Sequence, residues 1–327
     1  MKKIKIITTG GTIAMGKDQQ TGQIVPKLSG LDLLKQVPQL TKMADLELVQ
    51  YANLDSSQLT APMLLELAEL VEEALLEEEI DGVLITHGTD TLEETAYLLD
   101  LVLDIKKPVV ITGALRSFSQ LNSDGAANLV QSIQTILNPQ SKNKGVLAVI
   151  NEEIHAARFL SKMHTNNLNA FSSLNCGPIG TIDHSGIHYS YDLPAQITIH
   201  PEELEERVEI IKLAIGSDDR LIQAALDYDC QGLVLEAFGL GTLPEKIIPG
   251  LTRAKKEGVP VVITSRSYEG RVYNLYGASG GNADIRDLDL IFAGSLTSTK
   301  ARLLLMLLLG KNLSQTKIRE YYLKLKS

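Results

Sequence analysis

The chain has 327 residues, of which 44% are hydrophobic and 22% are charged, and its formal net charge is −9. This length exceeds what one hydrophobic core usually supports, so we expect two domains, and the ordinary composition excludes a disordered chain. The negative charge excludes nucleic acid and anionic membrane surfaces as partners, because nothing would offset the repulsion of their phosphates.

The cysteines and apolar runs indicate the compartment. Cys176 and Cys230 lie far apart, which argues against a disulfide framework or a zinc site, so we expect buried small apolar residues in a reducing compartment. The first three residues resemble the start of a signal peptide, but the segment after them is too short and polar for its apolar region. The longest apolar run, Leu303–Leu309, is shorter than the ~20 residues that cross a bilayer. We therefore expect a cytoplasmic protein without a membrane partner.

The first part of the chain alternates Val/Ile/Leu-rich runs with amphipathic stretches. This alternation is typical of an α/β fold with a mostly parallel sheet covered by helices on both faces. Thr60 is the expected N-cap of the helix that begins near Pro62. The predicted strands are Ile4–Thr9, Leu46–Asn53, Gly82–His87, Pro108–Gly113 and Gly145–Ile150, and the predicted helices are Leu31–Gln36, Pro62–Glu78, Glu93–Leu103 and Gly125–Leu137.

The pattern changes after Ile150. Polar and apolar residues alternate over residues 151–191 with turn residues between them, which predicts β-hairpins at a sheet edge. We expect residues 191–207 to link an N-terminal domain, residues 1–190, to a smaller α/β domain, residues 208–327, each with three layers. The predicted elements of the second domain are Val208–Ile215, Arg220–Tyr228, Gly232–Phe238, Glu245–Lys256, Val259–Ser265, Leu288–Ala293 and Thr297–Leu309.

Two loops at expected carboxyl ends of strands are rich in glycine and small hydroxyl residues. They are residues 8–14, TTGGTIA, and residues 86–91, THGTDT. In open parallel sheets such loops hold reactive residues, and glycine lets the backbone approach a ligand. The first loop could also be a tight turn or a phosphate loop, although it lacks the Lys-Ser/Thr of a P-loop and the spacing of a dinucleotide fingerprint. In the second loop, Asp90 is costly to bury without a cationic partner; alternatively, Asp90 or Thr91 caps the next helix.

Taken together, residues 9–14 and 87–91 resemble the two signature motifs of the bacterial-type L-asparaginase family, in the family's order and at its usual separation. Further matches cover essentially the whole chain: Asp55-Ser56-Ser57, Gly113-Ala114, Ser123-Asp124-Gly125 with Asn128, Arg158 with Lys162, residues 170–173 before residues 177–180, and residues 294–296 with residues 300–302. The resemblance implies hydrolysis of L-asparagine to L-aspartate and ammonia without a cofactor or metal, at the carboxyl edge of the N-terminal sheet. It also implies a homo-oligomer, a dimer or tetramer, in which the C-terminal domain of a neighbouring copy helps to close the pocket.

The resemblance assigns a role to each matching residue. Thr12 matches the nucleophile, and Thr89, Asp90 and Lys162 match a second catalytic group in which Lys162 accepts or shuttles a proton, Thr89 assists the attack and Asp90 also holds the substrate's α-amino group. The expected substrate-binding residues are Gly11, Asp55, Ser56, Gly88, Thr89, Asp90 and Ala114. A threonine hydroxyl needs a neighbouring base, and a lysine can serve only where its surroundings lower its pKa. The oxyanion needs donors already in place, which Thr89 and the N–H groups of the glycine loop could supply.

The chain departs from the family pattern in three places. Many members carry a lid tyrosine soon after the nucleophile, but here no Tyr occurs between Thr12 and Tyr51, and residues 22–27 form the corresponding loop. Asn282 or Asp284 stands where secreted members present a glutamate from a neighbouring copy, and Thr242 stands where others have asparagine. The group that activates Thr12 and the recognition of the substrate's ammonium group are therefore open.

The sequence leaves three other functions open. The same site could act on glutamine, serve as the amidase half of a tRNA-dependent amidotransferase, or belong to an amino-acid sensor that has lost turnover. The amidotransferase half would carry an extra segment before its first motif, which here begins at residue 8 and so disfavours it. The four matching catalytic residues argue against the sensor, whereas the missing tyrosine argues for it.

Other polar residues have simpler interpretations. His184 and His188 have the i, i+4 spacing of two metal ligands on a helix, but Ser185-Gly186 between them favours a hairpin turn. We expect His87 to support the second loop and Glu77–Glu79 to be the solvated end of a helix.

Overall fold

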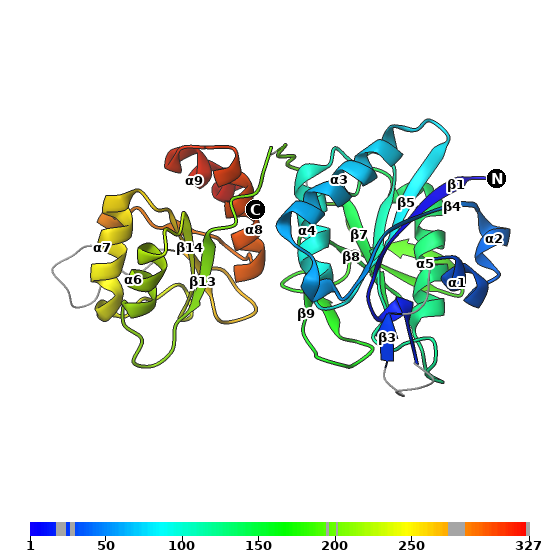
Figure 1. Cartoon of the computed structure of the whole chain (residues 1–327), viewed down its shortest axis with the longest axis horizontal. Coiled ribbons are helices and arrows are strands. Elements are labelled where there is room, and N and C mark those ends of the chain that lie inside the picture. The colour runs from blue at the N-terminus through cyan, green and yellow to red at the C-terminus, as the bar shows by residue number, and fades with distance from the viewer. Residues whose placement is uncertain (18–23, 27–29, 194–195, 201, 274–284, 325–327) are drawn as a thin grey trace. The chain divides into compact units, whose positions relative to one another are not determined.

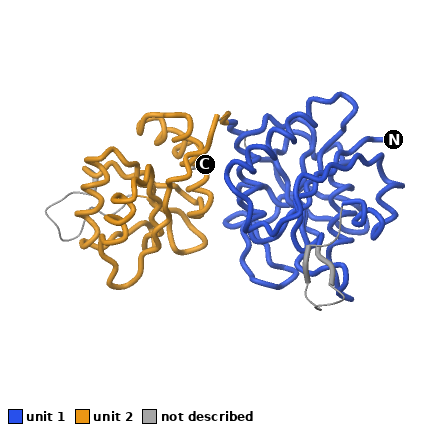
Figure 2. The backbone as a smooth tube through the Cα atoms, in the orientation of Figure 1, with its two compact units in different colours: residues 1–198 blue, residues 199–327 orange. Residues whose placement is uncertain are grey.

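The computed structural model describes residues 1–17, 24–26, 30–193, 196–200, 202–273 and 285–324. The chain forms two compact units, Met1–Thr198 and Ile199–Ser327 (Figure 2). The boundary falls within the expected linker, residues 191–207. Gln196 belongs to unit 1, because its side-chain amide donates a hydrogen bond to the carbonyl oxygen of Leu103 at 3.1 Å.

Unit 1 is built on an eight-stranded sheet with the order β12-β11-β8-β7-β6-β5-β1-β4 (Figure 1). The five strands from β7 to β4 are mutually parallel, and β8, β11 and β12 extend the sheet in antiparallel fashion. From one edge to the other, the strands are β12 Gly186–Tyr189, β11 Gly180–Asp183, β8 Glu153–Ala156, β7 Val146–Ile150, β6 Val109–Thr112, β5 Ile80–Thr86, β1 Lys3–Gly10 and β4 Asp45–Leu54.

Helices cover both faces of this sheet, as the alternating pattern predicts. Helices α3 and α4 lie on one face, and α1, α2 and α5 lie on the other (Figure 1). The helices are α1 Gly30–Gln36, α2 Leu40–Met43, α3 Ala61–Leu76, α4 Leu92–Val102 and α5 Gly125–Leu137, with short 3₁₀ turns η1 Thr12–Ala14, η2 Ser56–Gln58 and η3 Pro139–Ser141. Thr60 holds the N-cap position of α3, although its side chain makes no capping hydrogen bond.

Lys5 is a charged residue of strand β1 that is almost fully covered. It is only 7% exposed, and its ammonium group pairs with Glu47 at 2.8 Å and with Glu77 at 2.5 Å. Glu79 pairs with Lys3 at 2.7 Å. Glu78 and Glu79 are exposed, as expected for the solvated end of a helix. Glu77 is only half-exposed, because the buried ammonium group of Lys5 needs an anionic partner.

The strand order places a topological switch between β1 and β5. Across the sheet, the five parallel strands lie in the order β4, β1, β5, β6, β7, so the chain first moves from β1 to one side and then to the other. Ligands of open α/β sheets bind outside the carboxyl ends of the strands at such a switch. The two loops singled out in the sequence follow β1 and β5, the two strands that flank it.

The crossover from β6 through α5 to β7 has the opposite hand to the other three. The chain steps in the same direction from β5 to β6 and from β6 to β7, yet α4 and α5 lie on opposite faces of the sheet (Figure 1). Because nearly all β-helix-β crossovers are right-handed, the β6–α5–β7 connection is the left-handed one. It directs α5 to the face that carries α1 and α2, where α5 contacts α2.

The hairpins expected in residues 151–191 are present. Strands β7 and β8 are joined by Asn151 and Glu152, both with positive φ (53° and 67°), as a two-residue turn of the hairpin type requires. Strands β9 Leu160–Lys162 and β10 Phe171–Ser173 form a separate antiparallel ribbon, as do β2 Met15–Lys17 and β3 Ile24–Pro26.

The structure confirms some of the expectations for individual histidine and cysteine side chains and corrects others. His184 lies in the turn of the β11–β12 hairpin rather than on a helix, so it does not share a helical face with His188. Cys176 is exposed, which corrects the expectation that it is buried, because it follows β10 in a surface turn beside Asn175, whose φ is 67°. Cys230 is buried as expected, and both thiols are free.

Unit 2 is a smaller three-layer α/β unit. Its parallel sheet has the order β13-β14-β15-β16, with α6 and α7 on one face and α8 and α9 on the other (Figure 1). The elements are β13 Val208–Lys212, α6 Arg220–Asp227, β14 Gly232–Ala237, η4 Glu245–Ile247, α7 Ile248–Glu257, β15 Val261–Ser265, η5 Ile285–Leu288, β16 Ile291–Phe292, α8 Ser298–Gly310 and α9 Gln315–Lys324. Helix α9 is absent from the predicted elements. Among the described residues, no helix combines the length and the apolar character needed to cross a bilayer.

We predict that Asn128→Ala lowers the free energy of unfolding by about 3 kcal/mol, because it leaves buried backbone groups unpaired. Asn128, in α5, is 1% exposed; its amide donates to the carbonyl oxygen of Gly113 at 2.9 Å and its oxygen accepts from Asn151 N–H at 3.1 Å. Urea denaturation of Asn128→Ala, beside the exposed control Asn122→Ala, measures this loss. Equal unfolding midpoints for the two variants would contradict the prediction.

Candidate functional site

The loops after β1 and β5 meet at a pair of glycines. Gly11 has a φ of +78°, and a Cβ atom on it would overlap the backbone of Gly88. Only glycine therefore allows this backbone conformation and this approach together. The contact brings the neighbouring residues Thr12 and Thr89 into one region at the switch between β1 and β5.

Thr12 begins the 3₁₀ turn that follows Gly11 and is half-buried. The next residue, Ile13, is buried in one apolar cluster with Ala114, which is itself fully buried after β6. The N–H of Gly11 donates to the carbonyl oxygen of Leu54 at 3.0 Å. This amide is therefore already engaged, so it is not among the oxyanion donors that the glycine loop was expected to supply.

Ser56 connects the loop after β4 to the loop after β5. It is 5% exposed, and a Cβ on Gly88 would lie 2.8 Å from Ser56 Oγ. The backbone N–H of Thr91 donates to Ser56 Oγ at 3.3 Å, and Thr91 Oγ1 donates to the carbonyl oxygen of Ser56 at 3.0 Å. Asp55, next to Ser56, is exposed. Both residues thus border the region where Gly11 and Gly88 meet.

Lys162 lies at the end of β9 and binds the second loop with its amine. Lys162 Nζ donates to Thr89 Oγ1 at 2.9 Å and to Asp90 Oδ1 at 2.6 Å. The lysine side chain is 14% exposed and the aspartate side chain is 73% exposed, whereas Thr89 is buried. A threonine oxygen that accepts from an amine keeps its own hydrogen available for another partner, so this pair can pass a proton.

Two expectations about the second loop need correction. Asp90 pairs with a lysine as expected, but it is not buried, so the cost of burying a carboxylate is not the reason for the pairing. Thr91 holds the N-cap position of α4 without a capping hydrogen bond, because its hydroxyl is used by Ser56 instead. This helix therefore begins at a residue whose side chain connects the loops of the site.

His87 fixes the backbone of the second loop. Its ring is completely buried, its Nδ1 lies 2.7 Å from the carbonyl oxygen of Gly88, and its Nε2 lies 3.0 Å from Thr95 Oγ1. A carbonyl oxygen only accepts, so Nδ1 carries the hydrogen and Nε2 accepts from the threonine. Burial lowers the pKa of His87 to about 4, which keeps the ring neutral.

The loop after β6 completes one wall of the site. A Cβ on Gly113 would lie 2.6 Å from the carbonyl oxygen of His87 and 3.2 Å from Thr89 Cγ2. The carboxylate of Asp124 accepts from the N–H groups of Leu115 and Arg116 at 3.0 Å each, which fixes the loop before α5 begins. A Cβ on Gly125 would lie 3.3 Å from Ile13, so this loop also reaches the turn that holds Thr12.

The structure thus groups Thr12, Thr89, Asp90 and Lys162 with Gly11, Asp55, Ser56, Gly88 and Ala114 around the loop after β5. The remaining expected features belong to unit 2 or lie outside the described residues. Thr242 lies in unit 2, where its N–H donates to the carbonyl oxygen of Phe238 at 2.8 Å. Asn282, Asp284 and, within the loop at residues 22–27, residues 22, 23 and 27 lie outside the described residues.

Sequence reasoning missed Glu93. This side chain, in the first turn of α4, accepts the backbone N–H of Lys162 at 2.8 Å. An acidic residue in the first turn of a helix is commonly explained by the helix dipole, so its position alone did not indicate a contact with a distant strand. In the sequence, Glu93 lies three residues after Asp90, and this spacing from the second loop is the feature that could have indicated its role.

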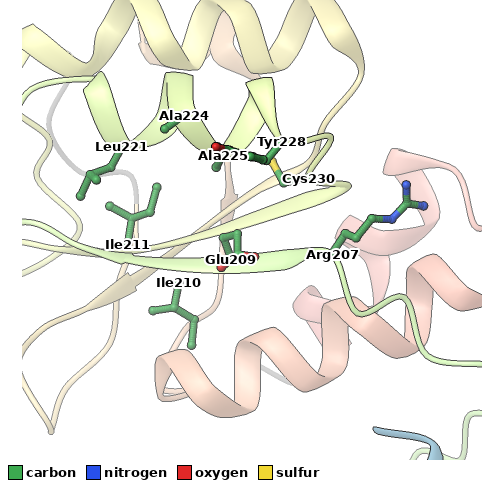
Figure 3. A pocket seen from close by; sticks show the side chains of 9 residues that line it. All are labelled: Arg207, Glu209, Ile210, Ile211, Leu221, Ala224, Ala225, Tyr228 and Cys230. Atoms are coloured by element: carbon green, nitrogen blue, oxygen red, sulfur yellow. The ribbon is translucent and has the colours of Figure 1, made fainter. Parts of the chain in front are cut away.

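A hollow in unit 2 is lined by the Cys230 thiol, whose pKa burial raises to about 11, so this thiol is not an activated nucleophile. The hollow measures about 400 Å³ and lies between β13 and α6, with Leu221, Ala224 and Ala225 of the helix in its lining, while Ile210 points away from α6 (Figure 3). The Arg207 guanidinium at its rim is paired with Glu205 at 2.8 Å and with Asp229 at 2.5 Å. We therefore assign the candidate site to the loops of unit 1.

We predict that His87 makes the protein less stable in acid. Its folded pKa, about 4, lies below the ordinary value of 6.5, so the unfolded chain binds the proton first. The free energy of unfolding should be unaffected above about pH 6.5 and should fall by about 3 kcal/mol between pH 6.5 and pH 4. His87→Gln should flatten this slope in urea titrations against pH, and the exposed control His184→Gln should not. A slope that stays unchanged in His87→Gln would rule out this origin.

Comparisons with known proteins match this chain to one family over nearly its whole length. Residues 3–195 match the family model described as "Asparaginase, N-terminal", and residues 207–322 match "Glutaminase/Asparaginase C-terminal domain". An L-asparaginase of Bacillus licheniformis is 34% identical over 94% of this chain and 96% of its own length. One component of a glutamyl-tRNA(Gln) amidotransferase from Methanobrevibacter smithii is 33% identical over 95% of this chain and 72% of its own length.

A solved structure is similar over the full length. The crystal structure of a probable cytoplasmic L-asparaginase from Campylobacter jejuni superimposes with a TM-score of 0.89 at 34% identity, covering 99% of each chain. Both family models, the sequence similarity and the fold thus agree along the whole chain. The chain therefore belongs to the asparaginase family.

Proposed function

We propose that the chain is an amidohydrolase that converts L-asparagine to L-aspartate and ammonia, with Thr12 as the nucleophile. The observation that carries the proposal is the group formed by Lys162, Thr89 and Asp90 beside the contact between Gly11 and Gly88. A weak alcohol nucleophile needs a neighbouring base, and this group offers an amine hydrogen-bonded to a second hydroxyl in the same site.

The proposed reaction has two stages. The Thr12 hydroxyl oxygen attacks the side-chain carboxamide carbon, and its proton passes through the Thr89 hydroxyl to the Lys162 amine. The tetrahedral adduct then collapses; the proton goes to the leaving nitrogen, so ammonia departs and an aspartyl ester remains on Thr12. Water, activated by the same pair, hydrolyses the ester, releases aspartate and restores the hydroxyl.

Substrate recognition is assigned to the residues around this group. Asp90 would bind the substrate's α-ammonium group, because its exposed carboxylate has oxygen lone pairs beyond those that Lys162 uses. Ser56 and Asp55, with the backbones of Gly88 and Ala114, would hold the remaining α-groups. Since the Gly11 amide is engaged by Leu54, we assign oxyanion stabilisation to the Thr89 hydroxyl and the other amides of the two loops.

Two further attributes rest on similarity alone. A cytoplasmic location is supported by the likeness to the Campylobacter jejuni protein, whose description includes that word. Assembly into a dimer or tetramer stays a prediction from the family resemblance, and sedimentation of the purified protein would measure it.

We predict that the purified protein releases ammonia from L-asparagine, with little release from L-glutamine and none without an amide. An enzyme-coupled ammonia assay on the three samples measures this directly. Comparable rates on both amides would instead indicate a glutaminase-asparaginase, which the combined name of the C-terminal family model allows. Binding of asparagine in calorimetry without ammonia release would reject the proposal in favour of a sensor.

We predict that Thr12→Ala and Lys162→Met each lower kcat by at least about 10³-fold, because each removes one partner of the nucleophile–base pair. The folded state should persist, as circular dichroism and the unfolding midpoint would show. The exposed residues Thr181 and Lys142 provide matched controls as Thr181→Ala and Lys142→Met. Acid quenching during turnover should leave an aspartyl group on the peptide that contains Thr12. Near-normal kcat in either site variant would remove that residue from the mechanism.

A further inference from the structure

The position of Lys162 is not fixed by strand pairing alone. It is the last residue of β9, which has three residues and pairs only with β10 among the described strands. Immediately after it, the N–H groups of Met163 and His164 both turn to the carbonyl oxygen of Ala170, where the ribbon closes into a loop. The amine at the candidate site is therefore carried by the end of a short ribbon outside the main sheet.

Glu93 anchors this strand end to the main body of unit 1. Its Oε2 accepts the Lys162 N–H at 2.8 Å, so α4 binds the backbone of the same residue whose amine binds the loop before α4. Helix α4 packs against β6 and β7 in the centre of the sheet. The bond thus connects the end of β9, which lies outside the eight-stranded sheet, to a helix that cannot move without disturbing the core.

Lys162 forms three hydrogen bonds with side chains that lie within five consecutive residues, 89–93. Thr89 and Asp90 accept from Nζ, and Glu93 accepts from the backbone N–H. The ion pair with Asp90 is a weak constraint, because the carboxylate is 73% exposed and solvent screens it. The position of the amine therefore depends on the Thr89 hydroxyl and on where the Lys162 backbone is held.

We propose that Glu93 is a positioning residue of the proposed reaction: its carboxylate holds the Lys162 backbone so that the amine reaches the Thr89 hydroxyl. The inference rests on the proposed function, in which Lys162 handles the proton. Glu93 does not contact the substrate in this proposal. Its contribution is geometric, since a displacement of about 1 Å in a reacting group can cost on the order of 10²-fold in rate.

Two conservative variants separate geometry from charge. Glu93→Gln keeps the length and one acceptor oxygen but removes the charge, whereas Glu93→Asp keeps the charge but shortens the side chain by one methylene group. If Glu93 holds the backbone, Glu93→Gln should retain kcat within about threefold, and Glu93→Asp and Glu93→Ala should lose about 10- to 100-fold with KM nearly unchanged. The matched controls are Glu73→Gln, Glu73→Asp and Glu73→Ala at an exposed position of α3.

Amide hydrogen exchange provides a measurement that does not depend on turnover. Exchange of the peptide that contains Lys162 should accelerate in Glu93→Asp and Glu93→Ala and stay at the wild-type rate in Glu93→Gln, because the bonded N–H is the one that Glu93 protects. This experiment also works in the Lys162→Met background, where only the backbone contact is tested.

Each contrary result has a distinct meaning. Glu93→Gln as slow as Glu93→Ala, with Glu93→Asp active, would replace positioning by a role for charge and overturn the proposal. Normal kcat in all three Glu93 variants would reduce Glu93 to helix stabilisation, which also overturns it. If Lys162→Met itself keeps normal kcat, Lys162 does not carry the proton, and the proposed function is rejected independently of Glu93. An inactive Lys162→Met with unaffected Glu93 variants rejects only the positioning role.

Discussion

The candidate site depends on one backbone contact, that of Gly11 with Gly88. Strands β1 and β5 are neighbours at the switch in strand order, and the loops that follow them meet because neither Gly11 nor Gly88 has a side chain at the contact. One flanking residue on each side carries a hydroxyl group, Thr12 and Thr89. A methyl group at residue 11 would force the loops apart and require a left-handed backbone from a residue that disfavours it. The proposed chemistry therefore rests on an approach that only glycine allows.

Around this contact, the polar groups differ sharply in exposure. Thr89 and His87 are buried, Lys162 is largely covered, and Asp90 is open to solvent. A buried hydroxyl keeps its geometry because its neighbours are packed, whereas an exposed carboxylate pairs weakly and can exchange partners. In the proposed reaction, proton transfer needs atoms in fixed positions, which the buried Thr89 and the largely covered Lys162 provide. Binding of the substrate's ammonium group needs an accessible anion, which the exposed Asp90 provides.

The sequence predicted the parallel strands of both sheets, and the central ones, such as β5, β6 and β7, carry Val/Ile/Leu runs that are buried on both faces. It predicted the two site loops because glycine and hydroxyl residues cluster at strand ends, and the family resemblance supplied Lys162. Periodicity could not predict the partners of Lys5, the exposure of Cys176 or the Glu93 contact, because each depends on which distant segments meet in space. Helix α9 was missed because it follows the long apolar run of α8, and its own pattern has only two buried residues, Ile318 and Tyr322.

The left-handed β6–α5–β7 connection has a consequence for the order of folding. A crossover of the usual hand can pack its helix on the sheet as soon as its two strands pair, because strand twist directs the helix to that face. Helix α5 lies instead on the face where α2 is its neighbour, so its apolar side gains full cover only after the N-terminal helices have docked. We expect the loop between β6 and α5, which borders both Thr89 and Ile13, to be among the last parts of unit 1 to become ordered. A nascent or partly refolded chain would then contain the reactive residues but lack the wall that encloses them, so activity would report completed folding rather than partial structure.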